Sequence, residues 1–215
     1  MVRYFLILCL GFPLTFLAQK KEPFVGKLVY SIEIVDTSLT KLIPPNEMVI
    51  YTNDTLIRIE NYTEQFGVQA IVKHLQLEKS YLLINTQYES YAIQTDHSKD
   101  SIRYPYTFEK KWFKRKINGF KGNRLSVMHE NFEEPLEYIY FKKYDVKYIN
   151  TLENFPGLPI QYFISSVDGT YRYTLKSMDS MESNRDWFGI PSNAKKVSFN
   201  QFMDDMIKFQ GMHEE

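Results

Sequence analysis

Short runs in which apolar and polar residues alternate, separated by turn signals, constrain the fold of this chain more than any other feature. Residues 25–35 are the clearest case, because apolar side chains occupy every second position from Leu28 to Ile34. A period of two places these side chains on one face of a half-buried β-strand. Similar runs predict further strands at 48–51, 56–60, 81–85, 90–95, 112–117, 124–129, 136–141, 160–165 and 171–175. Turn-forming dipeptides join three of the pairs: Asn53-Asp54, Asn118-Gly119 and Asp168-Gly169.

Residues 66–77 fit two structures. The spacing of Val68, Ile71, Val72 and Leu75 suits a helix, while the run 69–72 suits a strand equally well. The hairpins on either side favour the strand.

One helix is predicted at the end of the chain. Ser198 is a suitable N-cap, Gln201 completes a capping box, and Gly211 suits the end of the helix. Apolar residues recur at helical spacing after the cap: Phe199, Phe202, Met203, Met206 and Ile207. Such a stripe more often packs in a protein core than lines a ligand site, so we expect it to pack on the concave face of the sheet. A single helical turn is expected within 183–191, with Trp187 and Phe188 buried against the sheet.

The predicted fold class is therefore mainly β with a C-terminal helix, built as a curved antiparallel or barrel-like sheet. The 215 residues contain 26 basic and 26 acidic side chains. A net charge of zero argues against a nucleic-acid-binding protein, because such domains are strongly basic. No linker or repeat divides the chain, so one domain is expected over residues 19–215.

The first 18 residues have the pattern of a secretory signal peptide. Arg3 supplies the positive start, an apolar run follows, and Ala18 precedes a polar stretch. A retained membrane anchor is the alternative, although the run is short for a membrane span and contains Pro13. The single cysteine, Cys9, lies inside this segment, so the mature chain contains no disulfide.

No motif for catalysis or for a cofactor is present. The chain lacks a G-x-S-x-G elbow, a Walker loop and a G-x-G-x-x-G turn, and its four histidines share no ligand spacing. We therefore expect a protein that is not an enzyme and that holds neither metal nor cofactor.

A basic cluster with aromatic residues among the cations is the one candidate binding surface. Its members are Lys110, Lys111, Trp112, Lys114, Arg115, Lys116, Lys121 and Arg124. Such a surface suits anionic lipid headgroups or an acidic partner. The alternative is a solvated hairpin, balanced by Glu130, Glu133, Glu134 and Glu137, whose charge protects a sheet edge.

The segment Phe155–Tyr162 resembles the GLPGLI family of exported proteins from Gram-negative bacteria. Its core is Pro156, Gly157, Leu158 and Pro159, and Ile160 stands where the family motif has a second glycine, which also fits a sister branch. Residues 25–30, 117–121 and 188–191 add to the likeness. The resemblance implies a curved sheet similar to the half-barrel of periplasmic lipoprotein carriers, with a helix in its concavity, and it implies no catalytic residue. From the residues themselves, Gly157 is expected to adopt an unusual backbone angle and Pro159 to fix the entry to a strand.

The sequence leaves two hypotheses about the function. The first is a non-enzymatic envelope protein, soluble after signal removal, that binds a lipid or other apolar ligand in the concavity. The second is an interaction protein that uses the surface from Lys110 to Arg124 to engage an envelope protein or the membrane. Either places the chain in the periplasm or at the outer envelope.

Overall fold

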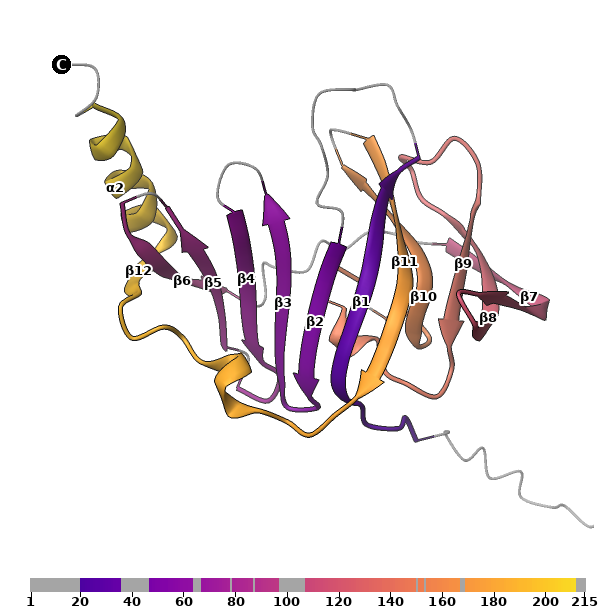
Figure 1. Cartoon of the computed structure of the whole chain (residues 1–215). Helices are drawn as coiled ribbons and strands as arrows, with labels where there is room; N and C mark the ends of the chain where they lie inside the picture. Colours follow the sequence, from indigo (N-terminus) through magenta and orange to yellow (C-terminus); the bar gives the residue numbers. More distant parts are fainter. Residues whose placement is uncertain are drawn as a thin grey trace, which may run out of the picture.

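Twelve strands form a single open sheet, in the order β12-β6-β5-β4-β3-β2-β1-β11-β10-β9-β8-β7 (Figure 1). The computed structural model describes residues 20–35, 47–63, 67–77, 79–86, 88–96, 107–149, 151–152, 154–166 and 169–211. The first six strands are β1 (Val25–Ile34), β2 (Glu47–Asn53), β3 (Leu56–Thr63), β4 (Gly67–His74), β5 (Lys79–Asn85) and β6 (Ser90–Asp96). The others are β7 (Thr107–Ile117), β8 (Phe120–Met128), β9 (Leu136–Phe141), β10 (Leu158–Ser166), β11 (Gly169–Ser180) and β12 (Lys195–Ser198). The helical elements are the 3₁₀ turns η1 (Val146–Tyr148) and η2 (Arg185–Phe188) and the helix α2 (Phe199–Gly211).

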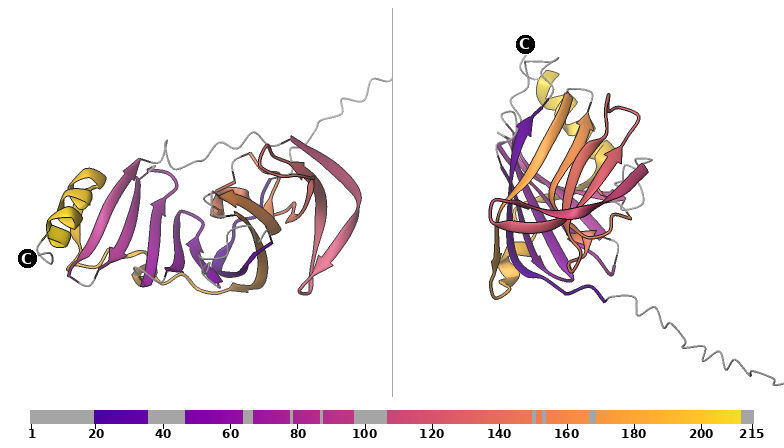
Figure 2. Two further views of the ribbon diagram at one scale, coloured as in Figure 1. Left: turned by 90° about the horizontal axis from the view of Figure 1, so that it is seen from above. Right: turned by 90° about the vertical axis from the view of Figure 1, so that its right-hand side faces the viewer.

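The predicted fold class is confirmed. The protein is mainly β with one C-terminal helix, and the sheet bends into an open trough with α2 and β7 at opposite ends (Figure 2, left). Neighbouring strands are antiparallel except for β12, which pairs in parallel with β6. Within the ambiguous segment 66–77, residues Gly67–His74 form a strand, β4, as the surrounding hairpins predict.

The main core lies on one side of the sheet, here called the inner face, which carries Leu28, Ile50 and Ile59. The period of two in β1 places Leu28, Tyr30 and Ile32 there, at most 5% exposed. Two tyrosines buried in this core donate to backbone carbonyls: the Tyr30 hydroxyl to Pro159 and the Tyr138 hydroxyl to Phe163, each at 2.7 Å. Such a bond removes the cost of burying a polar group within an aromatic core.

The turn between β2 and β3 is tied to η1 by a polar cluster. Asp54, in the left-handed conformation at φ 71°, accepts a 2.6 Å ion pair from Lys147 Nζ and a hydrogen bond from the Tyr148 hydroxyl. The Tyr148 oxygen in turn accepts from the Phe24 amide at 2.8 Å. Three distant segments of the chain are thereby held together beside the main core.

We expect acid to weaken this cluster. Partial burial by itself raises the pKa of Asp54, but the hydrogen bonds from Lys147 and Tyr148 and the Lys147 charge outweigh it, so the pKa lies below its ordinary value of 3.8. A carboxyl with a lowered folded pKa stabilises the fold above its unfolded pKa and loses that contribution as pH falls through the folded value. Stability should therefore fall below about pH 3.8 partly through this group, and Asp54→Asn should flatten that acid limb in urea unfolding measured against pH. An unchanged acid limb in the variant would contradict the assignment.

The opposite, outer face is covered in part by the segment that follows β11. Phe188 of η2 is 7% exposed and packs on Val72 and Leu83, while Trp187 is half-buried against Tyr51. The single turn predicted for this segment is confirmed, and Gly189 caps it by donating its amide to the Asp186 carbonyl at 3.3 Å.

Helix α2 begins as its sequence predicts. The Ser198 amide donates to Gln201 Oε1 at 2.9 Å, and the Gln201 amide donates to the Ser198 hydroxyl at 3.3 Å, which is a capping box.

A row of directly opposite residues runs along the inner face to the helix: Ile59, Ile71, Leu82, Ile93 and Val197. The helix therefore lies on the inner face, but it contacts β6 and β12 at the end of the sheet.

The expectation that the whole apolar stripe of α2 is buried was wrong. Phe202 is 6% exposed and Met206 is half-buried, whereas Phe199, Met203 and Ile207 are 58%, 42% and 62% exposed. The physical reason is that two end strands offer the helix a narrow surface, which covers one row of its side chains.

Candidate functional site

The basic cluster of the sequence lies on the hairpin formed by β7 and β8, at the edge of the sheet opposite α2 (Figure 1). The hairpin turns at Asn118 and Gly119, both at positive φ, as their dipeptide predicts. Its tip is anchored, because Asn118 Nδ2 donates to the Leu175 carbonyl at 3.0 Å and Phe120 packs edge-on against Phe141. The rest of β7 is exposed along its length.

A bulge in β7 carries the two aromatic residues of the cluster. Lys111 lies opposite Arg124 and Arg115 lies opposite Gly122, so residues 112–114 face the single residue Asn123. The extra residues leave the ladder and project from the edge. Trp112 is 97% exposed and Phe113 is 79% exposed. Two adjacent aromatic side chains in water need an explanation, because exposed apolar patches mark interaction sites.

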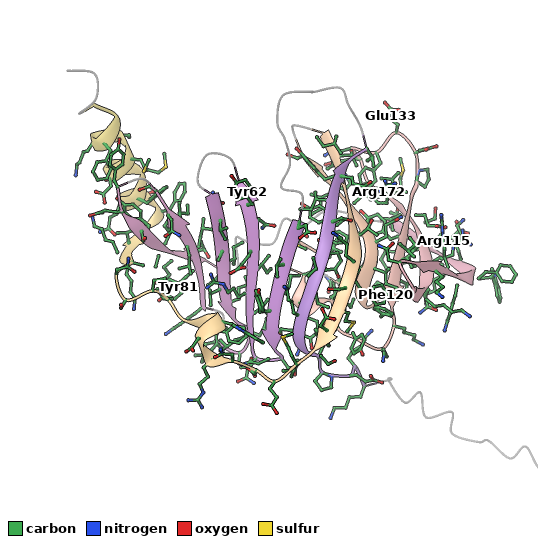
Figure 3. All side chains as sticks on the ribbon, viewed as in Figure 1. Tyr62, Tyr81, Arg115, Phe120, Glu133 and Arg172 are labelled. Carbon is green, nitrogen blue, oxygen red and sulfur yellow. The ribbon has the colours of Figure 1, made fainter. Side chains whose placement is uncertain are left out.

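The cations of the hairpin divide between its two faces. On one face, Arg115 and Arg124 both pair with Glu137 of β9, with Arg124 Nε at 2.6 Å from the carboxylate. Lys111 on the same face lies 3.2 Å from Glu109. Figure 3 shows the Arg115 side chain at this end of the sheet. Three of the cations thus pair with carboxylates of the protein, and two of the three share Glu137.

Glu137 is held ionised by its neighbours. Partial burial raises the pKa of the Glu137 carboxyl, but the hydrogen bonds and charges of Arg115 and Arg124 outweigh this, so the pKa lies below its ordinary range. The carboxylate therefore stays negative at neutral pH and continues to pair with both guanidinium groups, which leaves this group of three one net positive charge.

The other face of the hairpin carries cations that have no acidic partner among the described residues. Lys110 lies opposite Leu125 and Lys116 lies opposite Lys121, which places these three lysines on one face. Within the described part of the chain, none of them makes an ion pair, nor does Lys114 in the bulge. Like charges directly opposite one another destabilise a sheet, so the pair Lys116 and Lys121 opposes the stability of its own hairpin.

The structure thus brings all eight predicted residues together on one hairpin and sorts them into two kinds. Of the acidic residues expected to balance the cations, Glu137 pairs with two of them. Glu109, which pairs with Lys111, was not predicted. Phe108, 48% exposed on the same side as Lys110, was missed as well. The register of β7 against β8 determines on which face Glu109 and Phe108 lie, and the sequence alone does not reveal that register.

The segment Pro156–Pro159 has a structural role, but not for the expected reason. Gly157 does not have a positive φ, so the prediction of an unusual backbone angle was wrong. A side chain there would instead overlap the Phe141 carbonyl oxygen, because β9 and β10 meet closely at this point. Pro159 lies near the start of β10, as predicted for a strand entry.

Within the described ranges, no group of three His, Cys, Asp or Glu side chains is arranged as a metal site. In the same part of the chain, no helix has the length and apolar character needed to span a membrane. The predicted signal peptide, residues 1–18, lies outside the described residues and stays a prediction. Comparison with protein-family models, with characterised proteins and with solved structures finds no match.

Proposed function

We propose that this protein is a non-enzymatic binding protein that docks on an anionic lipid surface through the β7 bulge. The observation that carries the proposal is the pair Trp112 and Phe113, exposed side by side on a hairpin where four lysines make no ion pair with any described residue. The export signal predicted in residues 1–18 would bring this surface to the lipids of the cell envelope.

The residue types suit a membrane surface better than water. Tryptophan is stabilised at the boundary between headgroups and acyl chains, where its ring is buried and its N–H stays in contact with water, and phenylalanine buries its apolar ring at the same depth. Lysines extend their charged ends to headgroup phosphates while their aliphatic stems cover apolar surface. Each lysine near an anionic surface contributes about 1 kcal/mol of attraction.

The hairpin also gains in stability from such a contact. Lys116 and Lys121 repel one another across the ladder, and an anion between them would remove that repulsion. Edge strands are commonly protected by charge, which explains lysines on β7 but not an exposed Trp112 and Phe113 beside them. The aromatic pair therefore favours docking over a solvated edge.

The alternative, an apolar ligand held in the trough, stays a prediction with less support. The inner face between β1 and β10 is filled by the protein's own side chains, among them Tyr30, Tyr148 and Tyr162, each at most 1% exposed. Phe155 and Leu152 pack over the same surface. Side chains buried to this degree leave little room for a ligand between them.

Vesicle sedimentation at low salt tests the proposal. The purified protein should bind vesicles of phosphatidylglycerol and phosphatidylethanolamine and bind phosphatidylcholine vesicles weakly. Replacing Lys110, Lys116 and Lys121 with glutamine should lower the partition coefficient roughly hundredfold, since three cations contribute about 3 kcal/mol together. Salt should weaken the binding of the parent protein.

A matched control removes the same charge elsewhere. Lys79, Lys196 and Lys208 are exposed at the other end of the sheet, and their replacement with glutamine should leave binding within a few-fold of the parent. In a Trp187→Phe background, Trp112 is the only tryptophan, and its emission should shift to the blue on binding. Equal losses in the two triple variants, or no blue shift, would show that the hairpin does not touch the membrane.

A further inference from the structure

A pocket of about 460 Å³ lies on the outer face, where η2 and the residues after it pass over β2 and β3. Its apolar wall is formed by Trp187, whose ring centre lies 5.1 Å from that of Tyr51, and by Ile190 and Pro191. Its polar wall is formed by Arg58, Glu60 and Asp186. The volume falls in the range of pockets that bind small molecules.

The two charged groups on β3 are fixed in position. Arg58 Nε donates to Glu60 Oε1 at 2.6 Å, and Arg58 Nη1 donates to the Trp187 carbonyl at 3.3 Å. Their side chains are 20% and 26% exposed, so both are substantially withdrawn from water. The pair therefore connects the sheet to η2 and presents a defined polar edge beside the indole ring.

Hydrogen-bonding capacity is left over in this pocket. A guanidinium has five N–H donors, and the two bonds of Arg58 use two of them, while Oε2 of Glu60 accepts no bond within the described residues. Asp186 is exposed and lines the same pocket. The site thus offers spare donors and spare acceptors within reach of an aromatic face.

The charges restrict the ligand. An anion would meet Glu60 and Asp186, and a cation could not use the N–H donors that Arg58 has left, whereas a neutral ligand with hydroxyl groups can use both the spare donors and the spare acceptors. A hydroxyl group both donates and accepts, and it can therefore take a bond from the guanidinium and give one to a carboxylate. The face of an aromatic ring is negative and attracts C–H groups of partial positive charge. An apolar ligand would leave the polar wall unpaired.

We propose that this pocket binds a neutral sugar ring. One face of the sugar, with its C–H groups, packs on Trp187, and its hydroxyl groups bond to Arg58, Glu60 and Asp186. The pocket lies on β2 and β3, several strands away from the lipid-docking edge at β7, so the two proposals stand independently.

Tryptophan fluorescence tests the proposal on the full chain. In a Trp112→Phe background, Trp187 is the only tryptophan, so any saturable change in emission reports this pocket. Titration with methyl β-glucoside, N-acetylglucosamine and maltose should give such a change with at least one of them. Glu60→Gln and Asp186→Asn should each raise the dissociation constant about tenfold, because each removes a charged acceptor.

Controls separate binding from folding and from other ligands. Asp204→Asn removes an exposed carboxylate on α2 and should leave the dissociation constant unchanged, and thermal melting should confirm that Asp186→Asn folds like the parent. Choline chloride and sodium phosphate test the charged alternatives. Saturable binding of choline or phosphate in place of the sugars, or no saturable change with any of the three sugars, would overturn the proposal.

Discussion

Replacing Gly157 with alanine is expected to lower the free energy of unfolding by about 3 kcal/mol, which is a large share of the stability of an ordinary domain. A Cβ at this position would overlap the carbonyl oxygen of Phe141 and lie 3.0 Å from Tyr140 Cδ2. The first of these atoms belongs to the backbone of β9, so no side-chain rotation removes the overlap. Relief requires β9 and β10 to separate where Leu158 pairs with Phe141.

Gly189→Ala is the matched control. Gly189 has φ −68° and ψ 138°, which any residue adopts, and a Cβ there meets one atom, the Asp186 carbonyl oxygen, at an ordinary 3.5 Å. Loss of chain entropy in the unfolded state should then make the variant neutral or more stable by up to about 1 kcal/mol. Urea unfolding measures both. Equal midpoints for the two variants would mean that β9 and β10 do not approach as closely as described.

This contrast explains one failure of prediction from the sequence. The motif Pro156–Pro159 indicated that Gly157 is special, but the cause is the close approach of β9, which ends 16 positions earlier at Phe141. A local pattern reports φ and turn type; it does not report which distant strand lies above a residue. By contrast, the turn at Asn118-Gly119 was predictable because its positive φ values depend on those two residues alone.

Some of the predicted strands alternate strongly, and others, such as 136–141, were predicted from runs of aromatic and branched residues. In β1, buried side chains recur at every second position because one face meets the main core. β12 was not predicted, since Lys195–Ser198 offers one apolar residue and its partner β6 lies about a hundred positions earlier. The first half of β7 was missed as well, because residues 107–111 hold one large apolar side chain, Phe108, whereas the equally exposed second half begins with Trp112 and Phe113.

The residues of the candidate binding surface were predictable from the sequence, but which of its cations pair with acidic side chains was not. The seven cations were visible as a run, yet which of them are neutralised depends on the bulge and on the register of β8 against β9. In the sequence nothing distinguishes Arg115 from the neighbouring cations. In the structure it pairs with Glu137 of β9. A test that removes Lys114, Arg115 and Lys116 would therefore combine paired and unpaired cations, whereas Lys110, Lys116 and Lys121 all lack an ion pair within the described ranges.

Phe202→Ala should cost about 3 to 5 kcal/mol of stability, the range for truncating a buried phenylalanine. Phe202 is 6% exposed and packs edge-on against Tyr91, with ring centres 5.1 Å apart. Val197 and Met206 complete the cluster that joins α2 to the end of the sheet. Without the phenyl ring the helix retains few contacts, and urea unfolding should show a marked fall in the free energy of unfolding.

Phe199→Ala tests the same helix on its exposed row. Phe199 is 58% exposed, so its truncation should change stability by no more than about 0.5 kcal/mol. The two phenylalanines are three positions apart and were predicted from the sequence to be alike, and the position of α2 over β6 and β12 distinguishes them. Hydrogen exchange should locate the effect: in Phe202→Ala the amides of α2 lose most of their protection, while those of β1 and β11 remain protected. Equal losses in the two variants would mean that the helix buries its whole apolar stripe, as a helix filling the trough would do.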